Sequence, residues 1–216
     1  RDRSPSRGLG DVYKRQTYYL AYNSILELLR IKHYEVNVMK RGFKIVSSKK
    51  DQDIHLPQRQ TTRAAGYDFE ASEDFVLPSI WKGNFLKALW QIHQQKKLTD
   101  EEFKAADSCL KPYLVPTGIK AYMQPDEFLL LANRSSGPFK RRLILPNGIG
   151  IVDADYYDND SNEGEIFFQL INYGLRDYHI KKGERIGQGI FMPYLIADGE
   201  EQPTAKRTGG FGSTKE

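Results

Sequence analysis

The feature that most restricts the fold of this chain is a series of short apolar runs separated by glycine, proline and asparagine. From residue 42 onward the runs are too short to form a typical helix. Apolar runs of roughly four to eight residues between turn-forming residues are typical of β-strands. The sequence therefore predicts an all-β domain with strands at residues 43–46, 67–71, 127–132, 143–145, 149–152, 166–171 and 189–194.

One turn between two of these runs has a specific signal. Pro146, Asn147 and Gly148 separate the runs at 143–145 and 149–152. Asn-Gly readily adopts the positive φ angles that a tight hairpin turn needs. We therefore expect these two strands to form a β-hairpin.

Residues 80–110 break the β pattern. Trp81, Phe85 and Leu89 follow one another at a spacing of four, and Thr99 and Glu102 have the spacing of a helix capping box. The segment is predicted to be a helical insertion that holds both tryptophans. Its aromatic residues are interpreted as packing the insertion onto the β body; the alternative is a surface for a protein partner.

The two ends of the chain differ from this central part. Residues 1–16 lack periodicity and are predicted to be disordered, and a short amphipathic helix is predicted over 17–32. Met39 is hypothesised to be the natural start. The expected organisation is an N-terminal extension at 1–38, a β domain at 39–206 and a mobile C-terminal arm at 207–216.

Charge and composition exclude several classes of protein. The 216 residues carry a formal charge of +4, but residues 1–38 hold seven basic and four acidic residues, so the remainder is nearly neutral. No direct nucleic-acid binding is expected. No apolar run is long enough to cross a membrane, and the single cysteine, Cys109, cannot form an intrachain disulfide. These features favour a cytoplasmic protein.

The common catalytic signatures are absent. The four histidines are far apart in the sequence and match no metal-binding pattern, and neither a GxSxG elbow nor a Walker loop occurs. Chemistry must therefore come from clusters of glycine, serine, arginine and aspartate. Five such clusters occur in order, at residues 65–69, 133–137, 147–156, 183–188 and 207–214.

Two of these clusters suit phosphate binding. Arg134, Ser135 and Ser136 offer a guanidinium and two hydroxyls within a turn, which can hold phosphate oxygens. In the tail, glycines allow close backbone approach, Phe211 offers a face for stacking, and Arg207 can reach phosphate. These parts suit a nucleotide polyphosphate.

The five ordered clusters, together with residues 115–119, resemble the five motifs of the homotrimeric dUTP diphosphatase (dUTPase) family, and the similarity spans about 40–214. The helical insertion after the first motif is similar to dUTPases of Gram-positive bacteria and their phages. The resemblance implies a β-clip, or distorted jelly-roll, subunit that forms a homotrimer with shared active sites. It also implies Mg²⁺-dependent hydrolysis of dUTP to dUMP and pyrophosphate, which supplies dUMP for thymidylate synthesis and limits uracil in DNA.

The resemblance also implies residue roles. Asp153 would position the attacking water, and Tyr156 would pack against deoxyribose and exclude a 2′-hydroxyl. Asp68 would hold Mg²⁺ through water. Uracil would be received by Asn147, Gly148 and Ile151, and Val152 would also contact the substrate. The phosphates and the remaining nucleotide contacts would fall to Arg134, Ser135, Ser136, Gly137, Gln188, Arg207, Gly210, Phe211, Gly212 and Ser213.

Two features depart from the family pattern. Asp158 stands where a glycine is frequent, and residues 158–164 lengthen the turn after the third motif; the fifth motif is also shorter than its commonest form. Two other functions are weighed against hydrolysis of dUTP. A dCTP deaminase shares the fold but needs a general acid/base glutamate and generally lacks the glycine-rich arm. A regulatory binding protein built on a dUTPase scaffold would use the insertion to contact a protein partner.

Overall fold

A computed structural model describes residues 40–201, which belong to one compact unit. The predictions for residues 1–38, and those for the arm at 207–216, lie outside the described residues. The strands are β1 (Gly42–Ile45), β2 (Tyr67–Glu70), β3 (Phe75–Leu77), β4 (Tyr113–Pro116), β5 (Ile119–Tyr122), β6 (Glu127–Ala132), β7 (Leu143–Ile144), β8 (Gly150–Asp153), β9 (Phe167–Asn172), β10 (Tyr178–Ile180) and β11 (Arg185–Pro193). The helices are α2 (Gly83–His93) and α3 (Asp100–Asp107), with short helical turns η1 (Ser47–Lys49), η2 (Ser108–Leu110), η3 (Gly137–Arg141) and η4 (Ala154–Tyr156).

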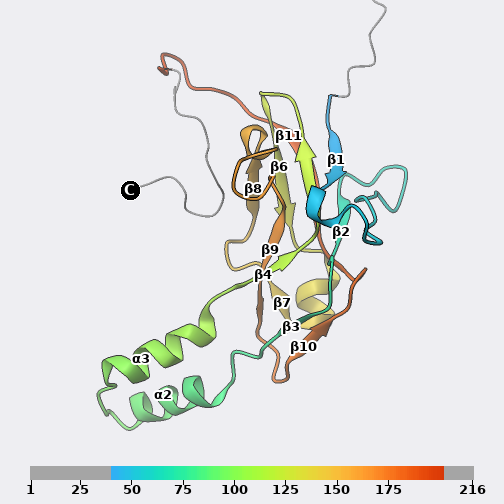
Figure 1. The fold of residues 1–216 in the computed structure, drawn as a ribbon. Coiled ribbons are helices and arrows are strands. Elements are labelled where there is room, and N and C mark those ends of the chain that lie inside the picture. The colour runs from blue at the N-terminus through green and yellow to red at the C-terminus, as the bar shows by residue number, and fades with distance from the viewer. Residues whose placement is uncertain (1–39, 202–216) are drawn as a thin grey trace, which may run out of the picture. The chain divides into compact units, whose positions relative to one another are not determined.

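The strands form small open sheets in which every named strand pair is antiparallel. The largest sheet has the order β2-β11-β6-β8, and a second has the order β4-β9-β7. Two further pairs join β1 to β5 and β3 to β10. Neighbours within each sheet are far apart in sequence, and Figure 1 shows them side by side in the β body. The predicted all-β class is confirmed.

The hairpin predicted around Asn147 is wrong. A turn is present, with a hydrogen bond from the Gly148 amide to the Leu145 carbonyl (3.1 Å) and a φ of +72° at Gly148. However, β7 pairs with β9, whereas β8 pairs with β6. The strands on either side of the turn therefore enter two different sheets. Only Gly148 of the Asn-Gly pair adopts the expected positive φ, and each strand pairs with a partner outside the turn.

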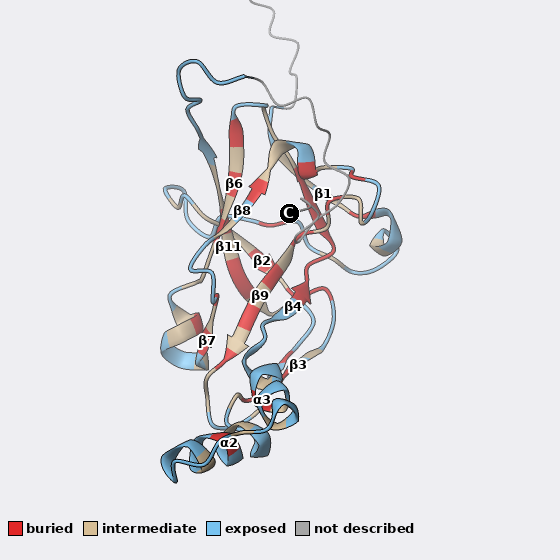
Figure 2. Cartoon of the chain, turned by 90° about the vertical axis from the view of Figure 1, so that its left-hand side faces the viewer, coloured by how far each residue is buried: buried red, intermediate tan, exposed pale blue. Residues whose placement is uncertain are grey.

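The core lies between these sheets, where strands alternate inward and outward residues. In β9, Phe168 and Leu170 are fully buried and their neighbours are partly exposed. Figure 2 shows buried residues concentrated along the strands. At Gly187 in β11, a Cβ atom would lie 1.9 Å from the Phe168 ring, so only glycine allows this strand to approach the core so closely.

The helical segment is present, and its capping box is confirmed. The Thr99 hydroxyl accepts a hydrogen bond from the Glu102 amide, and the Glu102 carboxylate accepts one from the Thr99 amide. This pairing satisfies two amide groups that would otherwise lack partners at the start of α3.

The aromatic residues of the helical segment do not pack it onto the β body. Trp90 is 62% exposed and Phe103 is 61% exposed, whereas the small residues Ala88 in α2 and Ala106 in α3 are the buried ones of this helix pair. Figures 1 and 2 show the pair extending away from the sheets with a mostly exposed surface. The packing interpretation is therefore wrong for most of the aromatic residues. The start of the segment is bound to the β body, through a hydrogen bond from the Trp81 indole to the Tyr173 carbonyl and an ion pair between Lys82 and Asp177 (3.0 Å).

Within residues 40–201, none of the helices has the length and apolar character needed to cross a membrane.

Candidate active site

A pocket of about 240 Å³ lies beside the edge strand β8. Four residues that were predicted to bind the substrate line it: Asn147, Ile151, Val152 and Tyr156. Along β8, Val152 is buried and Ile151 is half exposed, as expected for neighbouring residues on opposite faces of a strand.

Strand β9 supplies the opposite wall of the pocket. Phe167 and Gln169 line it, together with Glu165 just before the strand. Sequence reasoning missed these three residues. A signal was available, because the period of two in β9 puts Phe167 and Gln169 on the face opposite the buried Phe168 and Leu170.

Tyr156 lines this pocket and is buried, at 6% exposed. Its hydroxyl donates a hydrogen bond to the Glu165 carbonyl (2.9 Å) and accepts one from the side-chain amide of Asn162 (2.8 Å). The pocket therefore has a tyrosine wall whose ring is fixed at its outer end. Asp153, which precedes it in the sequence, ends β8 opposite Phe128 and is partly exposed.

A second cluster of predicted residues lies at the other edge of the largest sheet. The Asp68 carboxylate on β2 accepts a hydrogen bond from Arg134 (2.9 Å) and one from Arg185 (3.3 Å). Gln188 lies opposite Asp68 in the neighbouring strand and donates to the Asn133 carbonyl (3.0 Å). Asp68, Arg134 and Gln188, distant in sequence, are thus brought together.

The Arg-Ser-Ser loop follows β6 and leads into η3. The Gly137 amide donates to the Arg134 carbonyl (2.9 Å), which closes a turn around the two serines. Ser135 is exposed and Ser136 is partly exposed. A turn with hydroxyls beside a guanidinium can receive an anion.

A polar hollow of about 280 Å³ adjoins Asp68 and is lined also by His55, Glu70 and Arg185. A hydrogen bond with Glu70, together with the charges of Glu70 and Asp53, raises the pKa of His55. Within residues 40–201, no group of three or more His, Cys, Asp or Glu side chains could hold a metal ion by itself. A single carboxylate fits the chemistry of Mg²⁺, which keeps several waters and is commonly bound through substrate phosphates.

The two clusters are separated within one chain. Asp68 on β2 and Asp153 on β8 occupy opposite edges of the sheet β2-β11-β6-β8. Asp68 is in register with Ala132 through Gln188, whereas Asp153 is opposite Phe128. Three strand spacings and four residues along a strand place them about 20 Å apart. The predicted arm residues Arg207, Gly210, Phe211, Gly212 and Ser213 lie outside the described residues.

A small pocket with an apolar wall, and a loop that presents hydroxyls and a guanidinium, are parts that a nucleotide-binding protein uses. The dUTPase family model matches residues 98–215, more than half of the chain. The deoxyuridine 5′-triphosphate nucleotidohydrolase of Lactococcus lactis subsp. lactis is 42% identical over 175 residues, which cover 81% of this chain and 97% of that protein. The chain therefore belongs to the dUTPase family.

Solved structures agree with this assignment. The crystal structure of a dUTPase from Streptococcus mutans is similar with a TM-score of 0.57 at 36% identity, covering 73% of this chain and 99% of that chain. A mutant dUTPase from phage phi11 of S. aureus, for which the coordination of a structural Mg(II) ion is described, has a TM-score of 0.50 at 14% identity and covers 77% and 97%. The second similarity concerns the fold alone.

Proposed function

We propose that this protein hydrolyses dUTP to dUMP and pyrophosphate. The observation that carries the proposal is the pocket beside β8, because three residues predicted to contact uracil and deoxyribose, Asn147, Ile151 and Tyr156, line one cavity. Membership of the dUTPase family supports the same reaction.

The pocket wall suits a deoxyribonucleoside. Backbone groups of Asn147, Gly148 and Ile151 would receive uracil, since the turn and β8 run along the pocket. Tyr156 would lie against the sugar, and its buried ring would leave no room for a 2′-hydroxyl. Selection against UTP would then be steric.

The reaction itself would use Asp153 and the Arg-Ser-Ser loop. A carboxylate can orient and polarise a water molecule for in-line attack at the α-phosphorus. Arg134, Ser135 and Ser136 would bind the phosphates and stabilise the charge that develops on the departing pyrophosphate. The arm residues Arg207 and Phe211 would close over the nucleotide.

Magnesium would be held mainly by the nucleotide phosphates and water, with Asp68 contributing through water. The metal would supply charge neutralisation at the phosphates. In the described structure each Asp68 carboxylate oxygen binds a guanidinium group. Arg134 and Arg185 therefore already hold this carboxylate in a fixed orientation. Arg134 would exchange part of this contact for phosphate.

We also propose that the protein works as a homotrimer with shared active sites. The supporting observation is the distance of about 20 Å between Asp68 and Asp153 within one chain, which exceeds the reach of one triphosphate chain bound at both. A second copy would bring its β8 pocket to the Arg134 edge of the first. Cyclic symmetry would repeat the arrangement.

The most direct test incubates the protein with dUTP, UTP, dCTP and dTTP in Mg²⁺ and resolves the products by chromatography. We expect dUMP and pyrophosphate from dUTP, with the other three nucleotides largely unchanged. Release of ammonia from dCTP would indicate a deaminase instead. A folded protein that leaves dUTP intact would contradict the proposal.

A second role is proposed for the α2–α3 pair as a contact surface for a protein partner. Trp90, Ile92 and Phe103 are each more than half exposed on this pair. Exposed apolar groups gathered on one projecting element are typical of interaction surfaces. This role is compatible with catalysis, because the pair contributes no residue to the pocket beside β8.

A further inference from the structure

The loop at residues 158–164 folds back against Tyr156. Asp158 and Glu163 adopt positive φ angles of 54° and 56°, and the amide of Asp158 donates to the Glu163 carbonyl (3.1 Å). At Gly164, φ is +78° and a Cβ atom would lie 2.5 Å from the Tyr156 carbonyl oxygen. Only glycine allows the loop to lie so closely on the tyrosine backbone.

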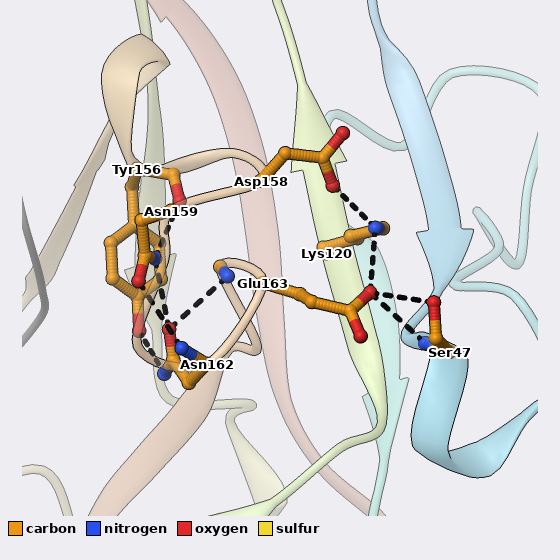
Figure 3. Close-up of polar contacts among 8 residues, drawn as sticks. Ser47, Lys120, Tyr156, Asp158, Asn159, Asn162 and Glu163 are labelled. Atoms are coloured by element: carbon orange, nitrogen blue, oxygen red, sulfur yellow. Dashed lines mark hydrogen bonds and ion pairs between the residues drawn. The ribbon is translucent and has the colours of Figure 1, made fainter.

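Two asparagines of this loop hold Tyr156 at both ends, as Figure 3 shows. Asn159, which is 7% exposed, donates from its side chain to the Tyr156 carbonyl (2.8 Å). The side-chain amide of Asn162 donates a hydrogen bond to the Tyr156 hydroxyl (2.8 Å). Because the hydroxyl also donates to the Glu165 carbonyl, the ring is fixed at its outer end by two hydrogen bonds.

The same asparagines organise the loop itself. The Asn162 side-chain oxygen accepts hydrogen bonds from the Asn159 side chain (2.9 Å) and the Gly164 amide (3.1 Å). Asn159 in turn accepts from the amides of Ser161 (3.0 Å) and Asn162 (3.2 Å). The position of the tyrosine ring is therefore coupled to the fold of the loop.

Lys120 ties the loop to the body of the protein. Its ammonium group, on β5 and largely buried, forms ion pairs with Asp158 and with Glu163 (3.0 Å). Glu163 also accepts hydrogen bonds from the amide (3.1 Å) and hydroxyl (2.9 Å) of Ser47 in η1. Figure 3 shows this chain of contacts from Ser47 through Glu163 and Lys120 to Asp158.

We propose that the loop at 158–164 is a positioning element for Tyr156, and that Asn162 is the residue through which it sets discrimination at C2′ of the sugar. The proposal rests on the proposed function. A pocket rejects one additional hydroxyl sterically only if its wall does not yield, since displacements of about 1 Å change rates by about 100-fold. Without the Asn162 side-chain amide, the ring loses one of the hydrogen bonds that fix its outer end, so it can move more readily away from a 2′-hydroxyl.

The test compares kcat/KM for dUTP and UTP in Asn162→Ala, Tyr156→Phe and the double variant. We expect Asn162→Ala to lower the dUTP:UTP ratio about tenfold, mainly through faster UTP turnover. In the Tyr156→Phe background, where no hydroxyl is present to be held, the same substitution should change the ratio much less. An unchanged ratio in Asn162→Ala, or an equal loss in both backgrounds, would overturn the role of Asn162.

A pair of lysine variants tests the anchor. Lys120→Met removes the ion pairs to the loop and should lower the ratio in the same direction by about threefold. Lys181→Met is the matched control, since it removes an exposed ion pair to Asp74 and should leave the ratio unchanged. Equal ratios in Lys120→Met and wild type would contradict anchoring by Lys120.

Equilibrium binding of dUMP and UMP separates this proposal from the proposed function. If the wild-type protein hydrolyses no dUTP, the proposed function fails. The ratio of the two dissociation constants still measures discrimination at C2′ in that case. A ratio that Asn162→Ala leaves at the wild-type value, even where the variant melts at a lower temperature, would assign Asn162 a structural role only.

Discussion

Asp153 ends β8 at the rim of the sheet, next to the turn that carries Tyr156. Because the proposed role of its carboxylate is to orient water, Asp153→Asn should lower kcat for dUTP by about 10²- to 10⁴-fold. The Kd for a non-hydrolysable dUTP analogue should change less than about threefold, since binding relies on other groups. Stopped-flow turnover and calorimetric titration measure the two quantities.

Asp155→Asn provides the matched control, because it neutralises an exposed aspartate two residues further on. It should retain kcat within about threefold of wild type. Near-normal kcat in Asp153→Asn, or an equal loss in both variants, would remove Asp153 from the proposed role.

The stability of the fold should depend on pH through the carboxyl group of Glu163. The hydrogen bond from Lys120, followed by those from Ser47, lowers the pKa of Glu163 from 4.5 to about 2. For Lys120, burial opposes the charge, but Asp158 and Glu163 outweigh it and raise its pKa. A carboxyl group with a depressed pKa in the folded state stabilises the fold above the unfolded pKa, and this stability is lost as pH falls toward the folded value.

The free energy of unfolding of wild type should therefore exceed that of Glu163→Gln at pH 6, and the gap should close between about pH 4.5 and 2. Urea unfolding at a series of pH values measures it. In the Lys120→Met background the gap at pH 6 should be smaller, because the partner with the largest effect is missing. A gap independent of pH would show that Glu163 acts without its charge.

At the scale of elements, the spacing of apolar residues and the turn residues between them were sufficient to predict a strand where its burial depends on the local sequence. The strands at β6, β9 and β11 were predicted because each alternates or runs apolar between turn residues, whereas the shorter β3, β4, β5 and β10 were missed. The turn at Gly148 was recognised, but not that its two strands pair with β6 and β9. Pairing between distant strands depends on side chains across the core, which a local pattern does not contain.

The helical pair shows the same limit in another form. The spacing of Trp81, Phe85 and Leu89 predicted a helix. However, the spacing of apolar residues along a helix does not identify the surface against which they pack. Here the small residues Ala88 and Ala106 are the buried ones, while Gln91 and Lys87 of α2 bind Glu102 of α3. Most of the aromatic residues therefore remain outside.

This arrangement predicts different results for two substitutions in the pair. Trp90→Ser removes a side chain that is 62% exposed, so it should change the melting temperature by less than about 2 °C and leave dUTP turnover within about twofold. Ala106→Trp inserts a large ring where α2 and α3 meet and should disrupt the pair. Differential scanning calorimetry, together with the nucleotide assay, measures both effects.

The two tryptophans of the chain, Trp81 and Trp90, make the pair visible by fluorescence. In Ala106→Trp the emission and helical circular dichroism should change, whereas turnover should be largely retained. Loss of turnover in Trp90→Ser with an intact fold would show that the pair takes part in the active site.

At the scale of the whole molecule, the residues of the proposed site form two groups in one chain. The Arg134 guanidinium meets Asp68 at the β2 edge of the largest sheet, whereas the pocket with Tyr156 lies beside β8 at the other edge. The sequence could supply both groups of residues but not their distance, because that distance follows from the strand order β2-β11-β6-β8. If a site combines the Arg134 edge of one copy with the β8 pocket of the next, each copy contributes to two sites.

Mixed trimers test this arrangement. Asp153→Asn and Arg134→Ala chains should each be nearly inactive alone, but any trimer that contains both holds one site with neither defect, because the copies follow one another around a threefold axis. Random mixing at equal amounts should therefore restore about a quarter of the wild-type activity per chain, since about three quarters of the trimers are mixed. Co-refolding, sedimentation and the dUTP assay measure it.

Mixing Asp153→Asn with Tyr156→Ala is the control without recovery, because every site then receives a defective β8 pocket. A trimer that recovers no activity in the first mixture would mean that each chain completes its own site.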